Sequence, residues 1–343
     1  MRVARKFAAG FAFTGGLLLV PFTAQACATC GCTLSADAAT GYSTATGWRL
    51  SMEMDYIDQN QLRSGTHTAS PGQVVDDPSD PDLGGGEIEK KTINRYFTVG
   101  IGYSPSADWN LNLLVPWIDR DHTTYGTQSM PYTSDETAAD QISGAHLSSV
   151  GDARFLVSYQ GLLPTRNLGV QLGVKLPTGN YGTHTQFDSG PAAGDALDAS
   201  LQAGTGSTDL ILGAYYYQAV SQDFDAFINA QYQTAVAHRQ DQSDNDFKPG
   251  NAFTLSTGVR YEANAAWIPQ LQLNFSHKSA DKGALADGPD TTGTVLYVSP
   301  GITARVLNQF HVYGFVQVPV YSKLDGYQLF PHWTASIGGV YAF

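Results

Sequence analysis

The stretch from Trp48 to Tyr56, WRLSMEMDY, alternates between apolar and polar side chains without a break. Its apolar residues are Trp48, Leu50, Met52, Met54 and Tyr56, and the residues between them are Arg49, Ser51, Glu53 and Asp55. Successive side chains of a β-strand point to opposite faces. The stretch therefore predicts a strand with one apolar face and one charged face.

The same period of two recurs along the rest of the chain. About twelve strands are expected, most of them near the roughly ten residues that a tilted membrane strand needs. Two of them, 293–305 and 310–322, are apolar on both faces, so their register stays open. The other alternating stretches are 97–103, 109–117, 153–159, 168–176, 210–216, 226–232, 253–261, 270–278 and 333–343.

The connections between these strands alternate between short and long. Outer-membrane barrels have tight periplasmic turns and long outer loops, whereas a soluble β-sandwich has no reason to keep such an alternation. The short connections lie near 104–108, 163–167, 221–223, 263–266 and 307–309. The long ones lie near 58–92, 119–149, 178–207, 237–250, 279–292 and 323–331.

Aromatic residues lie near both ends of the expected strands, where amphipathic rings favour the lipid headgroups. Phe343 ends the last strand and resembles the C-terminal signal that outer-membrane assembly machinery recognises. The rings on the short-turn side are Trp48, Tyr103, Trp109, Tyr261, Trp267 and Phe343, and those on the long-loop side are Tyr56, Trp117, Tyr232 and Trp333.

The composition supports an all-β chain. It has 36 glycines, 18 tyrosines and 16 phenylalanines, with only 15% charged residues. After residue 26 no stretch approaches the 18 consecutive apolar residues of a membrane-spanning helix. The fold class predicted here is a transmembrane, antiparallel, up-and-down β-barrel of about twelve strands.

The N-terminus has the features of a secretory signal. Arg2, Arg5 and Lys6 precede an apolar stretch that closes on Ala24-Gln25-Ala26, an A-x-A cleavage site. We expect a signal peptide over 1–26, a periplasmic cysteine-bearing segment over 27–47 and the barrel over 48–343. Loss of three positive charges would take the formal net charge from −12 to −15. Such an acidic chain has no electrostatic reason to bind nucleic acid.

Charged residues on the faces opposite the apolar ones predict a polar lumen, since a charge facing lipid costs roughly 2–4 kcal/mol at the midplane. Whether these charges line an open channel or form a closed ladder of ion pairs stays open, and loops or the N-terminal segment are further candidates for a plug. The expected lumen-lining residues are Arg49, Glu53, Asp55, Arg95, Asp152, Arg154, Lys175, Asp209, Arg260, Glu262 and Lys278.

From about Gly151 onward the chain resembles the outer-membrane transporter-like family named for the MetA pathway of phenol degradation. The resemblance implies an outer-membrane barrel that passes small, often aromatic or hydrophobic, compounds. The CxxCxC segment before the barrel is atypical for that family. The motifs that carry the resemblance are Gly151-Asp152-Ala-Arg154, Lys175-Leu-Pro177-Thr178-Gly179, Gly204-Thr-Gly206-Ser207-Thr-Asp209, Ser299-Pro300-Gly301 and Gln317-Val-Pro319-Val-Tyr321.

Other motifs point away from enzymes. Gly204-Thr-Gly206-Ser207 lacks the Gly-Lys-Ser/Thr ending of a phosphate loop and leads into a strand. Ser276 and His277 are neighbours on a strand, so they point to opposite faces and cannot form a nucleophile and base pair. The eight histidines are scattered without metal-ligand spacing. We expect no enzyme.

All three cysteines, Cys27, Cys30 and Cys32, lie within six residues. Covalent haem is excluded because Gly31, not His, follows Cys30. Four alternatives stay open: a disulfide with one spare thiol, a soft-metal site for Cu or Zn, lipidation of Cys27, and a partner-linked or redox-exchanging tail.

The expected function is a passive outer-membrane channel for small solutes, with both termini in the periplasm. Its expected partners are outer-membrane lipid, a small-molecule solute and the assembly machinery. The alternative is a soft-metal binding or redox-linked outer-membrane protein that uses the cysteine segment.

Overall fold

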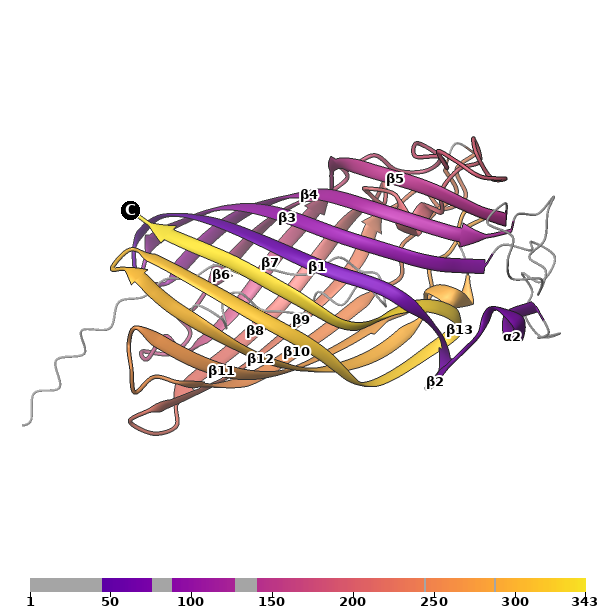
Figure 1. Ribbon diagram of the computed structural model, residues 1–343. Coiled ribbons are helices and arrows are strands. Elements are labelled where there is room, and N and C mark those ends of the chain that lie inside the picture. The colour runs from indigo at the N-terminus through magenta and orange to yellow at the C-terminus, as the bar shows by residue number, and fades with distance from the viewer. Residues whose placement is uncertain (1–44, 76–87, 127–140, 244, 287) are drawn as a thin grey trace, which may run out of the picture.

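The computed structural model describes residues 45–75, 88–126, 141–243, 245–286 and 288–343. These residues form a closed antiparallel β-barrel (Figure 1). Within the described residues no helix is long and apolar enough to cross a membrane. The strands are β1 (Gly47–Gly65), β2 (His67–Thr68), β3 (Ile88–Ser106), β4 (Trp109–Tyr125), β5 (Ile142–Val150), β6 (Ala153–Tyr159), β7 (Leu168–Leu176), β8 (Thr208–Ala219), β9 (Phe224–Ala237), β10 (Ala252–Tyr261), β11 (Trp267–Lys278), β12 (Gly293–Leu307) and β13 (Phe310–Ala342). The described residues also include the short α-helix α2 (Pro71–Val75) and the 3-10 helices η3 (Ala199–Leu201) and η4 (Pro289–Thr291).

The barrel closes because β1 pairs with β3 on one side and with β13 on the other. Every other strand of the ring pairs with its neighbour along the chain, and β2 and β5 lie outside this path. The carbonyl of Phe343 accepts a hydrogen bond from the Trp48 amide at 3.1 Å, so the last residue is tied to the first strand. Closure thus pairs the first strand of the ring with the last, as lipid requires.

Strand β13 runs along the barrel wall twice, in opposite directions. Residues 310–324 pair with β12, and residues 324–342 pair with β1. The amide of Ala342 donates to the carbonyl of Gln309 at 2.9 Å, so the two ends of this element meet. The element must therefore turn back, and Gly326, with a φ of +60°, lies at the turn. Eleven strand elements in the described ring thus give twelve passes, which confirms the expected fold class.

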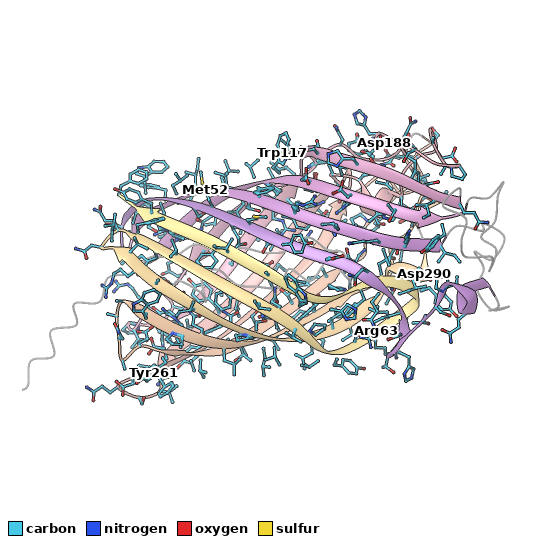
Figure 2. All side chains as sticks on the ribbon, viewed as in Figure 1. Met52, Arg63, Trp117, Asp188, Tyr261 and Asp290 are labelled. Carbon is cyan, nitrogen blue, oxygen red and sulfur yellow. The ribbon has the colours of Figure 1, made fainter. Side chains whose placement is uncertain are left out.

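The two faces of each strand differ as expected. On β1, Met52 is 59% exposed on the outside whereas Ser51 is 1% exposed on the inside. On β11, Leu271 and Leu273 are exposed on both sides of the buried Gln272. Met52 and Trp117 project from the outer surface of the barrel (Figure 2).

Exposed aromatic rings pair across strands near both ends of the barrel. At the short-turn end, the ring centroids of Trp48 and Tyr103 are 4.6 Å apart, and those of Phe224 and Tyr261 are 5.0 Å apart. Toward the long-loop end, Tyr56 and Trp333 lie 5.8 Å apart. Such belts fit the two headgroup regions of a bilayer.

The strands are longer than expected on the long-loop side. Residues predicted as loops belong to strands at 58–65, 88–92, 119–125 and 142–150, and the loop predicted over 323–331 is a tight turn inside β13. The reason is physical: beyond the aromatic belt a strand no longer faces lipid, so polar residues can occupy both of its faces. Period-two alternation then disappears although the hydrogen bonds continue.

We predict that Leu172→Arg, which puts a charge on the lipid face of β7, lowers the free energy of unfolding in lipid vesicles by about 2–4 kcal/mol. Leu172 is 55% exposed at the middle of its strand. Leu172→Ala is the control, because it removes apolar area without adding charge. Equal losses for both variants, measured by denaturant titration, would contradict the assignment of this face to lipid.

Candidate functional site

The interior of the barrel is polar and its polar side chains are buried. On β9 to β13 the inward residues are mainly amides and hydroxyls, and Asn274 donates to Ser299 at 2.8 Å. Short side chains such as Ser299 and Thr303 have almost no exposed surface, so the interior is closely filled at their level. The buried inward residues include Ser51, Gln59, Asn94, Asn112, Arg120, Gln231, Ser256, Gln272, Asn274, Ser299, Thr303, Gln317 and Thr334.

Nine of the eleven residues expected to line the lumen are buried. Glu262 lies in the short turn after β10, with 34% of its side chain exposed, and its carboxylate pairs with Arg260 at 3.1 Å. Lys278 pairs with Asp281 at 2.8 Å near the long-loop end. The nine buried residues are Arg49, Glu53, Asp55, Asp152, Arg154, Lys175, Asp209, Arg260 and Lys278.

Arg95 was expected to line the lumen, but it lies on the outer face of the barrel. Its neighbours Asn94 and Tyr96 are buried in the interior, so Arg95 is on the outer face of β3 together with exposed Phe97. There its guanidinium contacts the carboxylates of Asp119 and Asp121 at 2.6 and 2.8 Å. Arg95 and Phe97 are two residues apart in the sequence and therefore share a face of the strand, which already indicated the outer face for Arg95.

Two carboxylates of β1 form a pair on the inner wall. Glu53 and Asp55 are two residues apart and share a face. The hydroxyl of Tyr313 donates to Glu53, and the hydroxyl of Ser336 donates to Asp55. Both carboxyl groups are therefore held on the inner wall by hydroxyl donors from β13.

Apolar side chains meet across the interior at one level. Leu114, Leu156 and Ile211 belong to the same buried cluster as Tyr313, Phe315 and Val340. The first three come from β4, β6 and β8 and the others from β13, which is not a sheet neighbour of those strands. These side chains therefore narrow the interior. The alternating pattern did not predict this layer.

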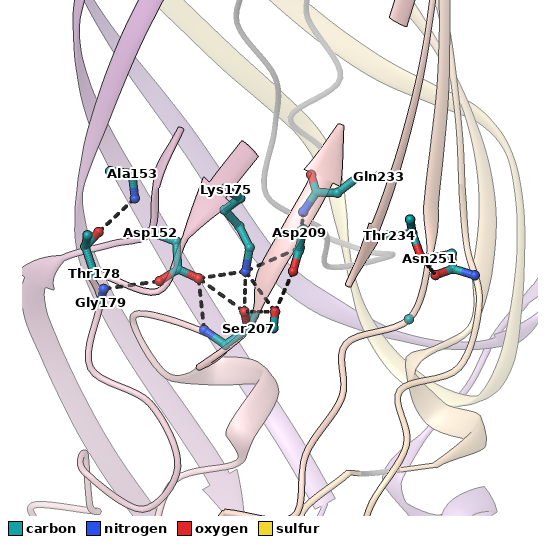
Figure 3. Close-up of polar contacts among 12 residues, drawn as sticks. Asp152, Ala153, Lys175, Thr178, Gly179, Ser207, Asp209, Gln233, Thr234 and Asn251 are labelled. Carbon is teal, nitrogen blue, oxygen red and sulfur yellow. Dashed lines mark hydrogen bonds and ion pairs between the residues drawn. The ribbon is translucent and has the colours of Figure 1, made fainter. Parts of the chain in front are cut away.

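A buried ion-pair cluster lies where β6, β7 and β8 reach their long-loop ends (Figure 3). The ammonium of Lys175 lies 2.8 Å from Asp152 and 3.3 Å from Asp209. Thr205 and Ser207 add hydroxyls to the cluster, and Asp209 also accepts from Gln233. All three charged side chains are at least 97% buried, so one ammonium serves two carboxylates that have little contact with solvent.

This cluster joins three motifs that are far apart in the sequence. Asp152 accepts hydrogen bonds from the amides of Gly179 and Thr205, both at 3.1 Å. Thr178 bridges the break between β5 and β6, since its hydroxyl donates to the Gly151 carbonyl and accepts from the Ala153 amide. A Cβ on Gly179 would lie 2.8 Å from the Ala203 carbonyl oxygen, so only glycine allows the two backbones to approach this closely.

Asp152 thereby binds both ends of residues 177–207, which we term the inward loop. The C-terminal part of this loop enters the barrel, whereas its middle lies along β5. Arg120, an inward residue of β4, donates to the carbonyl of Leu201. Ala203 packs with Ile57, Tyr96, Ile118 and Leu147, which belong to β1, β3, β4 and β5. An outer loop was expected here. The short glycine motifs at its two ends were the only sequence signal of this arrangement.

The cluster does not favour covalent catalysis. Ser207 lies 3.2 Å from the Lys175 ammonium, a spacing that a serine and lysine dyad would need. However, the Lys175 nitrogen is already engaged by the carboxylates of Asp152 and Asp209, at 2.8 and 3.3 Å, so it is not directed at the hydroxyl alone. The arrangement is that of a structural ion-pair cluster.

The cysteine segment at Cys27, Cys30 and Cys32 lies outside the described residues. Among the residues that the structure describes, no group of three or more His, Cys, Asp or Glu side chains could hold a metal ion. Cu or Zn binding by the cysteines stays a prediction.

The fold is similar to the crystal structure of an outer-membrane channel from Pseudomonas putida F1, with a TM-score of 0.62, 12% sequence identity, and coverage of 87% of this chain and 96% of that chain. The β domain of the Bordetella autotransporter BrkA has a TM-score of 0.49 at 12% identity, over 87% of this chain and 100% of that chain. No family model and no curated protein matches the sequence. At this identity the first similarity shows the fold alone, which is that of an outer-membrane barrel.

We predict that Lys175→Met destabilises the barrel by about 3–5 kcal/mol, because it leaves two buried carboxylates without their cation. The matched control is Arg166→Met, since Arg166 forms an exposed ion pair with Asp108 at 2.6 Å. Loss of that pair is expected to cost at most ~1 kcal/mol. Denaturant unfolding in vesicles measures both values, and equal costs would contradict the structural role of the cluster.

Proposed function

We propose that this protein is an outer-membrane channel for small solutes. The observation that carries the proposal is the interior: a membrane barrel whose inner face is built from buried amides, hydroxyls and paired charges. A barrel that served only as an anchor could fill its interior with apolar side chains at lower cost, since buried polar groups are expensive unless they are paired. The similar fold of an outer-membrane channel agrees with this function.

The narrow parts of the interior limit the size of the solute, and the residues that line them indicate its chemistry. Twelve strands give a barrel intermediate between filled eight-stranded barrels and the wide porins. The apolar layer around Phe315 and the inward loop both reduce its cross-section. The surface under the inward loop is apolar at Ile57, Ile118 and Leu147. These apolar residues, which are buried under the loop, agree with a small solute that has an aromatic or other apolar part, as the family resemblance implies.

The short-turn end is proposed to face the periplasm. The chain ends at this end of the barrel (Figure 1). A secretory signal over residues 1–26 would deliver the chain to that side, and the last strand with Phe343 would be available there to the assembly machinery. The long strands beyond the second aromatic belt would then face outward. The carboxylates and hydroxyls of the interior act as solvating groups for the solute, and no chemical step is required of them.

The channel function predicts conductance in planar bilayers, with a preference for cations at a pH at which the Glu53 and Asp55 carboxyls of the inner wall are ionised. The double variant Glu53→Gln, Asp55→Asn should move the reversal potential in a KCl gradient toward zero. Asp108→Asn, which changes an exposed turn, should leave it unchanged. A purified, folded barrel without any conductance would contradict the proposal.

A further inference from the structure

Three glycines face the interior beside the apolar layer, whose members are Leu114, Leu156, Ile211, Tyr313, Phe315 and Val340. They are Gly173 on β7, Gly301 on β12 and Gly338 on the second pass of β13. None of the three has a positive φ, so any residue could adopt their backbone conformation. Glycine weakens the interior of a strand and often marks a close approach by another group. What these three positions provide is therefore space and not backbone freedom.

The ring of Phe315 lies over Gly301. The two residues are directly opposite each other in the ladder between β12 and β13. A Cβ on Gly301 would overlap Cδ1 and Cε1 of the ring and would lie 2.5 Å from its Cγ. Because Cγ is the ring atom nearest the backbone, a small rotation of the ring does not relieve this overlap. The ring thus occupies the space that a side chain at Gly301 would need.

Tyr313 lies over Gly338 in a similar way. A Cβ on Gly338 would overlap Cζ and the hydroxyl oxygen of the Tyr313 ring. The same hydroxyl donates a hydrogen bond to Glu53 of β1, which is the register partner of Gly338. The ring therefore extends along the wall from the first pass of β13, across Gly338, to β1. The hydrogen bond to Glu53 fixes its far end.

A second tyrosine has the same arrangement elsewhere on the inner wall. Tyr215 of β8 is opposite Gly169 of β7, and a Cβ on Gly169 would overlap its ring. Its hydroxyl donates at 3.1 Å to Gln160, the residue that follows β6. A tyrosine that crosses a glycine to reach the next strand is thus a repeated feature of this barrel.

The opposite wall of the apolar layer also pairs a large side chain with a glycine. Leu156 of β6 is directly opposite Gly173, where a Cβ would overlap Leu156 Cδ2 and would lie 3.4 Å from the Cβ of Ile211. Leu114 of β4 is opposite Gly100 of β3. Both walls of the layer therefore use glycine beside the residues that narrow the interior.

A ring displaced from Gly301 has one direction in which to move. Ser299 and Thr303, the inward neighbours of Gly301 on β12, are at most 1% exposed. Gln317, the next inward residue after Phe315 on β13, is also fully buried. Closely packed side chains leave no room for a ring to slide along the wall. The displaced ring would therefore move toward the interior and toward Leu156 in the same cluster.

We propose that Gly301 and Gly338 set the width of the solute path at the apolar layer, and thereby the size of solute that passes. They do so by holding the rings of Phe315 and Tyr313 along the wall. A methyl group at either position narrows the path without changing any residue that lines it. This inference rests on the proposed channel function, because it assigns the residues that limit the same path.

A double-mutant cycle on single-channel conductance tests this assignment. Gly301→Ala should lower the conductance severalfold, because the Phe315 ring moves into the path. Phe315→Ala should raise it only slightly in the wild-type background, where the ring already lies along the wall, and should restore it in the Gly301→Ala background. Equal effects of Phe315→Ala in both backgrounds would overturn the inference. Gly338→Ala with Tyr313→Ala gives the same cycle at the second glycine.

The matched control is Gly314→Ala. Gly314 is next to Phe315 on β13 but faces outward, and a Cβ there would meet only the Ser336 carbonyl oxygen, at 3.8 Å. This variant should therefore keep the wild-type conductance. A loss of conductance equal to that of Gly301→Ala would overturn the inference, because it would show a general effect of alanine in this strand.

The position of the ring can also be measured without any solute. The Leu156 methyl groups belong to the same buried cluster as Phe315, so a ring that moves toward them changes their NMR chemical shifts. In the folded, leucine-labelled barrel, Gly301→Ala should shift the Leu156 signals in the wild-type background and not in the Phe315→Ala background. Unchanged Leu156 signals would overturn the inference. A barrel with these shifts that never conducts would refute the channel function, while the ring positions would stand.

Discussion

The structure depends on one constraint, which is that lipid offers no hydrogen bonds to the backbone. A sheet in lipid must therefore close, and here closure is the pairing of β1 with the second pass of β13. Once the ring closes, each strand has one face toward lipid and one toward the interior. The apolar outer residues, the aromatic belts and the polar interior all follow from that division.

The same constraint explains why so many hydrogen bonds surround the break between β5 and β6. Where β7 ends, the wall loses a ladder, and the polar groups near the break must find other partners. Thr178 satisfies the backbone on both sides of Asp152, and Asp152 binds the two ends of the inward loop. The buried cluster around Lys175 costs desolvation, and the loop that it positions is the feature that narrows the outer half of the interior.

Much of the fold was predictable from the sequence because lipid imposes period two on each membrane-spanning segment. Met52 against Ser51 and Leu271 against Gln272 are cases where the pattern alone assigns the face. The pattern failed where lipid no longer acts, as in 119–125, and where a tight turn at Gly326 replaced a loop. The inward loop was not predictable, because its position depends on contacts between residues as distant as Asp152 and Thr205. The motifs around Gly151, Pro177 and Gly204 indicated only that these positions were unusual.

The central claim is that lipid solvates alternate residues of each strand. Spin labels placed singly at each position from 270 to 275 on β11, in reconstituted vesicles, test it most directly. The account predicts that oxygen, which concentrates in lipid, relaxes the labels at Leu271, Leu273 and Phe275 strongly and those at Gln270, Gln272 and Asn274 weakly. Uniform relaxation along the strand, or the opposite phase, would contradict it.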